Sequence, residues 1–322
     1  MKYTQLTEGE RYQIYGLLKE GFSQKAIARN LERHPSTISR ELKRNKGLRG
    51  YRHQQANRFA MERRCYAKKH IKLTAEVQSW IRTLIEQDLS PEQVSNYLER
   101  HRGLRLHHET IYQFIYRDKG HGGELHKHLR IANKPYRKRY GKYDRRGQIV
   151  NRVSIDERPK IVDEKSRIGD WEGDTIIGKG HKGALLTLVE RKTLYTVIVP
   201  LKGKNAEQLK QAAIEVLTPL KERVLTVTYD NGKEFAEHEQ MAKALEADIY
   251  FAHPYASWER GINENANGLI RQYFPKGTDL RDVTIEQTQM VMDRLNNRPR
   301  KTRGGKTPNE LFMGLQVDLL TA

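Results

Sequence analysis

The chain contains 322 residues, of which 59 are Lys or Arg and 40 are Asp or Glu, so its net charge is +19. Its one cysteine, Cys65, excludes a disulfide framework and a cysteine-based zinc module and fits a reducing cytoplasm, and no apolar run approaches the roughly 20 residues that cross a bilayer. A charge this positive favours a polyanionic partner, with nucleic acid ahead of an anionic membrane surface.

Three short helices are predicted within the first 44 residues. Thr7 and Glu10 have the spacing of a capping box at the start of the first helix. Ser23 caps the second helix, and Pro35 suits the first position of the third, which covers 35–44. This order is the plan of a helix-turn-helix motif, whose last helix enters the DNA major groove.

Polar and basic side chains mark one face of that third helix. A small bundle with a charged outer face is the alternative, but short polar side chains at the helix start, with basic ones behind them, favour DNA recognition. The side chains expected to face DNA are Ser36, Thr37, Ser39, Arg40, Lys43 and Arg44.

Residues 73–117 repeat the three-helix pattern. Thr74 opens one helix, Ser90 and Gln93 form a second capping-box start, and a third helix begins near residue 108. This unit is nearly neutral, and its aromatic residues favour a core or an interface over base stacking. Whether it contacts DNA stays open.

The positive charge is concentrated in the first half of the chain. Residues 1–150 hold 33 Lys and Arg against 15 Asp and Glu, whereas residues 151–322 hold 26 against 25. The stretch from 126 is basic and poor in large aliphatic residues, which predicts a linker in which Lys138 and Arg139 bind DNA of any sequence. The predicted domains are a helix-turn-helix domain at 1–60, a second helix-turn-helix-like domain at 61–125, a basic linker at 126–158 and an α/β domain at 159–322.

Strand-like periodicity replaces the helical pattern after residue 168. Strands are predicted at 170–177, 184–191, 194–201, 224–230 and 247–252, and helices at 205–217, 233–245 and 257–274. Three meandering strands followed by alternating helices and strands describe a mixed sheet covered on both faces. Ribonuclease-H-like folds have this order of elements, so the fold class is multidomain, α followed by α/β.

Three acids of this half are candidates for one site. Asp230 ends a strand of a crossover unit, where ligand sites form, and Asp174 lies in the strand expected beside it. Glu264 avoids the apolar stripe of the last helix. Asn267 and Arg271 share its face and are expected to contact DNA.

Each acid also has an ordinary explanation. Asp230 begins an Asp-Asn-Gly turn signal, and Glu264 suits a solvated helix face. Asp170 and Glu172 alternate with Asp174 on one strand face, so alternation alone does not choose among them. The combination on this sheet plan is more specific than any one acid.

Carboxylates focused in one pocket repel one another, and divalent cations remove that conflict. Mg²⁺ prefers oxygen ligands and keeps water positions open for a phosphate. A pair of such ions activates the attacking oxygen and stabilises the leaving oxygen of an in-line phosphodiester displacement. We therefore expect Asp174, Asp230 and Glu264 to hold Mg²⁺, in two sites.

Distinctive runs of sequence occur along almost the whole chain. They are TISREL at 37–42, LSPEQVSNYL at 89–98, HETIYQFIY at 108–116, WEGDTIIG at 171–178, YDNGKEF at 229–235, HPYASWERGINENANGLIRQYFPKGTD at 253–279 and NNRPRKTRGGKTPNELF near the end. Between Asp230 and Glu264 lie 33 residues. With these runs and this spacing, the chain resembles the bacterial insertion-sequence transposases of the IS30 family.

The resemblance implies a retroviral-integrase-like catalytic core in which Asp174, Asp230 and Glu264 are the catalytic triad and Mn²⁺ can replace Mg²⁺. It implies a protein of the bacterial cytoplasm and nucleoid, acting as a homodimer or higher oligomer. Such a protein binds the terminal inverted repeats of its own element and target DNA, nicks, and joins ends by transesterification through circular intermediates. Asp170 departs from the family pattern, where His is more common.

Other functions are weighed on the same residues. A tyrosine recombinase needs a late nucleophilic tyrosine, and none follows Tyr273. A non-catalytic DNA-binding regulator stays possible if the acids do not converge. The histidines invite a zinc site, but without cysteines their irregular spacing favours surface or DNA-contact roles; they are His101, His107, His108, His121, His126 and His128.

Overall fold

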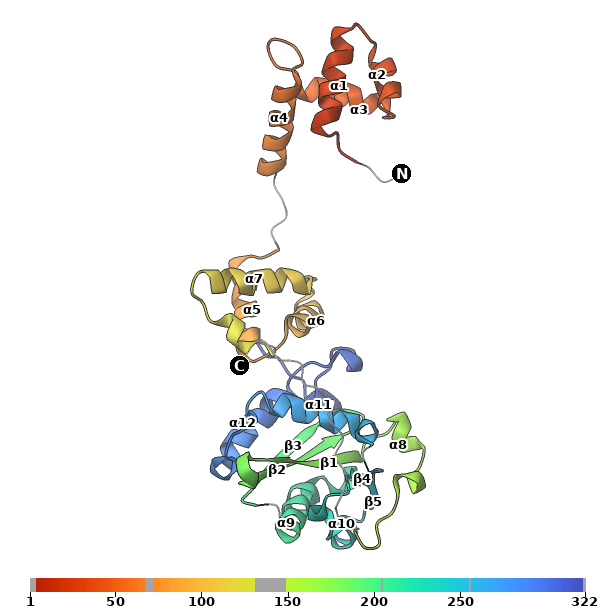
Figure 1. The fold of residues 1–322 in the computed structure, drawn as a ribbon, viewed down its shortest axis with the longest axis vertical. Coiled ribbons are helices and arrows are strands. Elements are labelled where there is room, and N and C mark those ends of the chain that lie inside the picture. The colour runs from red at the N-terminus through yellow and green to blue at the C-terminus, as the bar shows by residue number, and fades with distance from the viewer. Residues whose placement is uncertain (1–3, 68–71, 131–148, 204, 255, 321–322) are drawn as a thin grey trace. The chain divides into compact units, whose positions relative to one another are not determined.

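The computed structural model describes residues 4–67, 72–130, 149–203, 205–254 and 256–320. The chain divides into two compact units, residues 1–72 and 73–322, and each is described by itself (Figure 1). Lys138 and Arg139 of the predicted linker lie outside the described residues.

Four helices form the first unit: α1 (Glu8–Lys19), α2 (Gln24–Asn30), α3 (Pro35–Asn45) and α4 (His53–Tyr66). The predicted caps are confirmed, because Thr7 and Glu10 form a capping box and the Ser23 side chain accepts a hydrogen bond from the N–H of Ala26. Ile38 of α3 is buried against α1 and α2 in a small apolar core. The helix-turn-helix arrangement of α2 and α3 is thus present.

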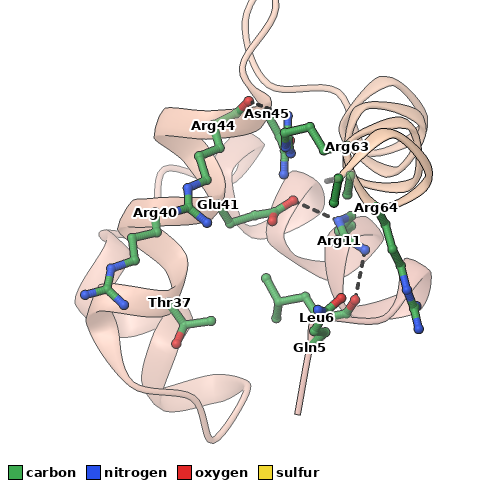
Figure 2. A pocket seen from close by; sticks show the side chains of 12 residues that line it. Gln5, Leu6, Arg11, Thr37, Arg40, Glu41, Arg44, Asn45, Arg63 and Arg64 are labelled. Carbon is green, nitrogen blue, oxygen red and sulfur yellow. Dashed lines mark hydrogen bonds and ion pairs between the residues drawn. The ribbon is translucent and has the colours of Figure 1, made fainter. Parts of the chain in front are cut away.

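The helix patterns of the sequence do not anticipate α4, which crosses the expected domain boundary at residues 60 and 61. Arg11 of α1 and Glu41 of α3 form a buried ion pair, with 2.8 Å between Nε and Oε1 (Figure 2). Arg11 Nη1 also donates to Oδ1 of Asn57 in α4, at 3.2 Å. This buried network joins α4 to the helix-turn-helix, so the first unit extends to Lys72.

The second unit begins with α5 (Ala75–Glu86), α6 (Pro91–Arg102) and α7 (His108–Gly120). The predicted caps at Thr74 and Ser90 are confirmed. Residues near the end of the chain complete this helical core: Leu319 is buried in it, and the Tyr97 hydroxyl donates to Asp318 Oδ1 at 2.6 Å. The three helices are therefore packed together with a segment some 200 residues away.

A five-stranded sheet follows, with strand order β3-β2-β1-β4-β5. Its strands are β1 (Asp170–Ile177), β2 (Ala184–Glu190), β3 (Thr196–Leu201), β4 (Thr226–Tyr229) and β5 (Asp248–Phe251). β1, β2 and β3 pair antiparallel, whereas β4 pairs parallel with both β1 and β5. This is the predicted ribonuclease-H-like topology.

Helices cover both faces of the sheet (Figure 1). On one face lie α9 (Ala206–Leu217) and α10 (His238–Leu245), and on the other lie α11 (Gly261–Ile270) and α12 (Ile285–Asn296). Two short helices, α8 (Ile161–Glu164) and α13 (Pro308–Phe312), flank this core. Phe312 of α13 packs against Trp171 of β1, with ring centroids 5.6 Å apart.

Two helices differ from their predicted extents. The stretch expected as one helix at 233–245 is a 3₁₀ turn at Lys233–Phe235 followed by α10, and the Phe235 ring stacks on Tyr229 at 4.2 Å. The helix expected at 257–274 begins with a 3₁₀ turn at Ser257–Arg260 and its α-helical part ends at Ile270. The chain turns there because Phe274, which precedes a proline, is buried in the core beside α12.

Candidate active site

The parallel pairing of β1 with β4 brings two predicted acids to one edge of the sheet. Glu172 is the register partner of Thr228. Asp174 and Asp230, each two residues further along, therefore lie side by side toward the same end of the sheet. Both line a cavity of about 510 Å³, together with Thr175, His181, Lys233 and Glu234 among others. Asp174 and Asp230 thus converge as predicted.

A glycine permits this convergence. A Cβ atom on Gly173 would lie 2.1 Å from Cε1 of Tyr229, so only glycine lets this ring pack directly against β1. Tyr229 is fully buried and immediately precedes Asp230, just as Gly173 immediately precedes Asp174. The close approach of ring and strand therefore sets the separation of the two acids.

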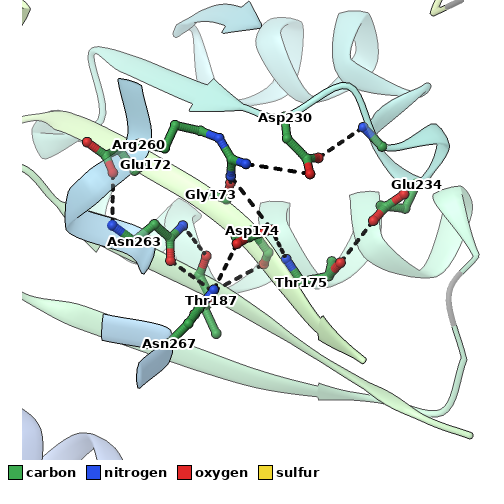
Figure 3. Close-up of polar contacts among 11 residues, drawn as sticks. Glu172, Gly173, Asp174, Thr175, Thr187, Asp230, Glu234, Arg260, Asn263 and Asn267 are labelled. Carbon is green, nitrogen blue, oxygen red and sulfur yellow. Dashed lines mark hydrogen bonds and ion pairs between the residues drawn. The ribbon is translucent and has the colours of Figure 1, made fainter. Parts of the chain in front are cut away.

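Neighbouring groups hold each carboxylate in place (Figure 3). Asp174 Oδ2 accepts a hydrogen bond from Nδ2 of Asn267 in α11 at 2.8 Å, and Asp230 Oδ1 accepts one from the N–H of Gly232 at 2.9 Å. The Asp174 side chain is 23% exposed and that of Asp230 is 30% exposed. Both acids are oriented yet remain open to the cavity.

The guanidinium of Arg260 lies between the two carboxylates. Its Nη1 is 3.6 Å from Asp174 Oδ1, and its Nη2 is 3.5 Å from Asp230 Oδ2. The same Nη1 donates to the carbonyl oxygen of Gly173 at 3.2 Å. Burial raises the pKa of the Asp174 carboxyl, Arg260 opposes that rise, and Asp230 adds to it. The two carboxylates therefore share one positively charged group, the guanidinium of Arg260.

Glu264 is placed apart from this pair. It is exposed on α11, one helical turn before Asn267, and does not line the cavity. Over the described residues, no group of three or more His, Cys, Asp or Glu side chains is arranged to hold a metal ion. The structure thus brings together two of the three predicted acids.

The other acids of β1 are used inside the fold. Asp170 is fully buried and accepts hydrogen bonds from Arg167 at 2.9 and 3.0 Å. Glu172 is 1% exposed, accepts from the N–H of Asn263 at 2.9 Å and lies 3.3 Å from Arg191. Of these three acids of β1, only Asp174 lines the cavity.

Two residues predicted to contact DNA form hydrogen bonds within the protein around the site. Asn267 orients Asp174, as above, and its Oδ1 accepts from the Thr187 hydroxyl at 2.9 Å. Arg271 donates to the carbonyl oxygen of Ile177 at 2.9 Å, and burial lowers the pKa of its guanidinium. Both side chains therefore tie α11 to the sheet in this structure.

Sequence reasoning missed two residues of the site. Arg260 lies in the 3₁₀ turn before α11, where periodicity gives no information on side-chain direction. Glu234 is 4% exposed, and its Oε1 accepts from Thr175 Oγ1 at 2.9 Å, so it links the strand of Asp174 to the loop after Asp230. Its place four residues after Asp230, in the YDNGKEF run, is the only signal that pointed to it.

The predicted DNA-facing residues of α3 lie on its outer side. Ser36 and Thr37 are partly exposed; Ser39, Arg40, Lys43 and Arg44 are exposed. The helix start is fixed by the His34 side chain, which accepts a hydrogen bond from the N–H of Ser36 at 3.2 Å. Among the described helices, none combines the length and apolar character needed to cross a membrane.

Comparison with known proteins gives several similarities. A helix-turn-helix domain family matches residues 2–45. The chain is 46% identical to the transposase of insertion sequence element IS4351 from Bacteroides fragilis, over 95% of each chain. It is 38% identical to an IS30 transposase of Escherichia coli, over 95% of this chain and 83% of that one, and 37% identical to the IS1086 transposase of Cupriavidus metallidurans, over 97% and 95%.

Solved structures with similarity are retroviral integrase catalytic cores. The core of BIV integrase is 20% identical with a TM-score of 0.36, over 46% of this chain and 95% of that one. The HTLV-2 integrase core in complex with magnesium is 19% identical with a TM-score of 0.34, over 44% and 92%.

Proposed function

Because this chain belongs to the IS30 family of bacterial insertion-sequence transposases, we propose that it cleaves and joins DNA at the terminal inverted repeats of its own element, with Asp174, Asp230 and Glu264 as catalytic acids. One observation carries the proposal: Asp174 and Asp230 lie together at one end of the sheet, on either side of the Arg260 guanidinium. The cavity beside them is open to a phosphodiester.

The residues present fit a divalent metal ion. The two carboxylates offer only oxygen donors, which suits Mg²⁺, with Mn²⁺ able to replace it. That Arg260 already bridges them indicates that this edge stabilises positive charge. When two ions are bound, they activate the attacking oxygen and stabilise the leaving oxygen of an in-line displacement.

The protein's own side chains orient the reaction. Asn267 fixes the Asp174 carboxylate through α11, and the N–H of Gly232 fixes that of Asp230. Glu264 lies about one turn before Asn267 on the same helix. A rearrangement of the first turn of α11 that brings it to the site is part of the proposal.

In the first step, a water oxygen bonds to phosphorus at the element end, and the 3′ oxygen leaves with a proton as a free hydroxyl. In the second step, that 3′ hydroxyl attacks a second phosphodiester and displaces its 3′ oxygen, so one ester bond forms as another breaks. Circular intermediates with abutted ends follow from this second step when both ends belong to one element.

The remaining assignments are part of the same proposal. α3 binds the terminal repeats in the major groove, and target DNA binds at the cavity beside Asp174 and Asp230. The basic segment 126–158 binds DNA of any sequence. Because two ends must be paired, the acting form is a homodimer or a higher oligomer. Its place of action is the DNA of the bacterial nucleoid.

The test is a nicking assay with the purified protein, Mg²⁺ and a labelled duplex that carries an element end. Asp230→Asn is expected to lose at least about 1,000-fold in nicking rate while it still binds the duplex. Asp248→Asn is the matched control, because Asp248 is exposed at the opposite end of the neighbouring parallel strand. Metal-dependent nicking by Asp230→Asn at the control rate would refute the assignment.

A further inference from the structure

A second cavity lies in the first unit, between α3 and the end of α4. It has a volume of about 480 Å³, and its walls carry four exposed arginines, Arg40, Arg44, Arg63 and Arg64 (Figure 2). Arg40 and Arg44 come from α3, one turn apart, while Arg63 and Arg64 come from the last turn of α4. Two helices thus direct their basic side chains to one cleft.

The frame of this cleft is rigid. Arg11 and Glu41 form the buried ion pair described above and are 7% and 8% exposed. Arg11 Nη1 also donates to the carbonyl oxygen of Leu6 at 2.9 Å, and the Tyr51 hydroxyl donates to Glu41 at 3.2 Å. Because these contacts join α1 to α3 and to the segment before α4, they hold the helices from which the wall arginines project.

The charge of the cleft is not compensated by nearby acids. Arg11 is neutralised by Glu41, but within the described residues none of the four wall arginines forms an ion pair with a carboxylate. Elsewhere on α4, Arg58 lies 3.7 Å from Glu62. Four positive charges gathered without counter-charges repel one another, and an anionic ligand with several charges removes that repulsion.

One wall arginine has its direction fixed by the protein. Arg63 donates to Oδ1 of Asn45 and, through Nη1, to the carbonyl oxygen of Arg44 at 3.3 Å. Asn45 is 2% exposed, so this anchor is buried. The guanidinium of Arg63 is therefore held at the cleft before any ligand arrives, which lowers the entropic cost of binding.

We propose that this cleft is a binding site for the sugar–phosphate backbone of duplex DNA, in which Arg44, Arg63 and Arg64 contact phosphates beside the groove that α3 enters. The inference rests on the proposed function, since α3 must be at the DNA. It adds α4 as a part of the DNA-binding surface. Arginine forks suit phosphate oxygens, and such contacts fix the register of the protein without reading bases.

The test uses the full-length protein and fluorescence titrations of two labelled duplexes, an element end and a scrambled sequence, over a range of salt concentrations. Each lost phosphate contact lowers the slope of log K against log salt by about 0.9. When the salt concentration rises from 50 to 200 mM, the affinity of both proteins falls. For the double variant Arg63→Gln/Arg64→Gln, the factor of this fall is expected to be about 12 times smaller than for the unaltered protein. For the single variant Arg64→Gln, the factor is expected to be about 3.5 times smaller than for the unaltered protein.

The matched control is Arg58→Gln, which removes the same charge from the same helix outside the cleft and should leave the slope unchanged. Arg64→Gln also guards against misfolding, because no hydrogen bond among the described residues of the first unit depends on its side chain. For both cleft variants, affinity should fall by the same factor on the two duplexes. Slopes equal to that of Arg58→Gln would overturn the proposal, as would a loss confined to the element end.

The outcome for the proposed function is separate. If the unaltered protein binds the two duplexes equally, recognition of the terminal repeats fails, while the slopes on the scrambled duplex still decide whether the cleft binds phosphates.

Discussion

Replacement of Arg260 by glutamine tests the central feature of the candidate active site. The variant keeps a hydrogen-bonding side chain, although a shorter one, and removes the positive charge between Asp174 and Asp230. A unit charge at the observed 3.5 Å interacts with a carboxylate by about 1 kcal/mol at the dielectric constant of water and by about 5 kcal/mol at the value typical near a protein surface. Because both carboxylates are about a quarter exposed, we expect a loss near the lower figure.

In EDTA, Arg260→Gln should therefore be less stable than the unaltered protein, since two carboxylates then face one cavity without a cation. A loss of about 1 to 2 kcal/mol corresponds to a melting temperature lower by about 2 to 8 °C in a unit of this size. Added Mn²⁺ should raise the melting temperature more in the variant. In calorimetric titration, Mn²⁺ should bind the variant about tenfold more tightly, because the ion no longer competes with Arg260 for the carboxylates.

Two further variants define the comparison. Arg260→Lys keeps the charge and should lie between the two proteins in both measurements. Arg281→Gln removes a more exposed arginine that pairs with Asp279, at 2.6 Å, and should change neither value by a similar amount. The reasoning is refuted if Arg260→Gln has the same melting temperature in EDTA as the unaltered protein and binds Mn²⁺ with the same affinity.

Two other predictions follow from local geometry. Gly173→Ala should lower the melting temperature and abolish nicking, because its Cβ atom would lie 2.1 Å from the Tyr229 ring; a stable, active variant would contradict this. Contacts with Glu259 and Asp156 raise the pKa of His253, so this imidazolium stabilises the fold at low pH and the contribution is lost as pH rises through the raised pKa. The difference in urea unfolding between the unaltered protein and His253→Gln should shrink from about pH 6 to about pH 9.

Local rules explain what the sequence predicted well. Thr7, Ser23 and Ser90 were assigned as helix caps from spacing alone, and each accepts the expected backbone hydrogen bond. The strand β1 has the predicted bounds, and it pairs with β4 as expected from the ribonuclease-H-like order of elements. These features depend on neighbours in sequence or on general topology, so one sequence is enough to find them.

Contacts between distant segments explain what the sequence missed. Arg260 meets Asp174 and Asp230 from a 3₁₀ turn, and no periodic pattern gives the direction of a side chain there. The role of Leu319 in the core of α5–α7 depends on a return of the chain across the whole second unit. Glu264 is exposed because it lies off the apolar stripe of α11, but a helical wheel does not show where that side of the helix lies relative to Asp174 and Asp230.

Arginines differ in their surroundings between the two units. The burial and the carboxylate partners of each arginine side chain show this difference, which the net charge does not. In the second unit Arg158, Arg191 and Arg298 are at most 7% exposed, and Arg191 lies 3.3 Å from the buried Glu172. Arg191 acts as an internal counter-charge, and its removal leaves the buried carboxylate of Glu172 unpaired, which is costly for stability. Arg44 and Arg64 are exposed and lack carboxylate partners in the described part of the first unit. Substitution of Arg44 or Arg64 should therefore weaken DNA binding, whereas substitution of Arg191 should lower stability.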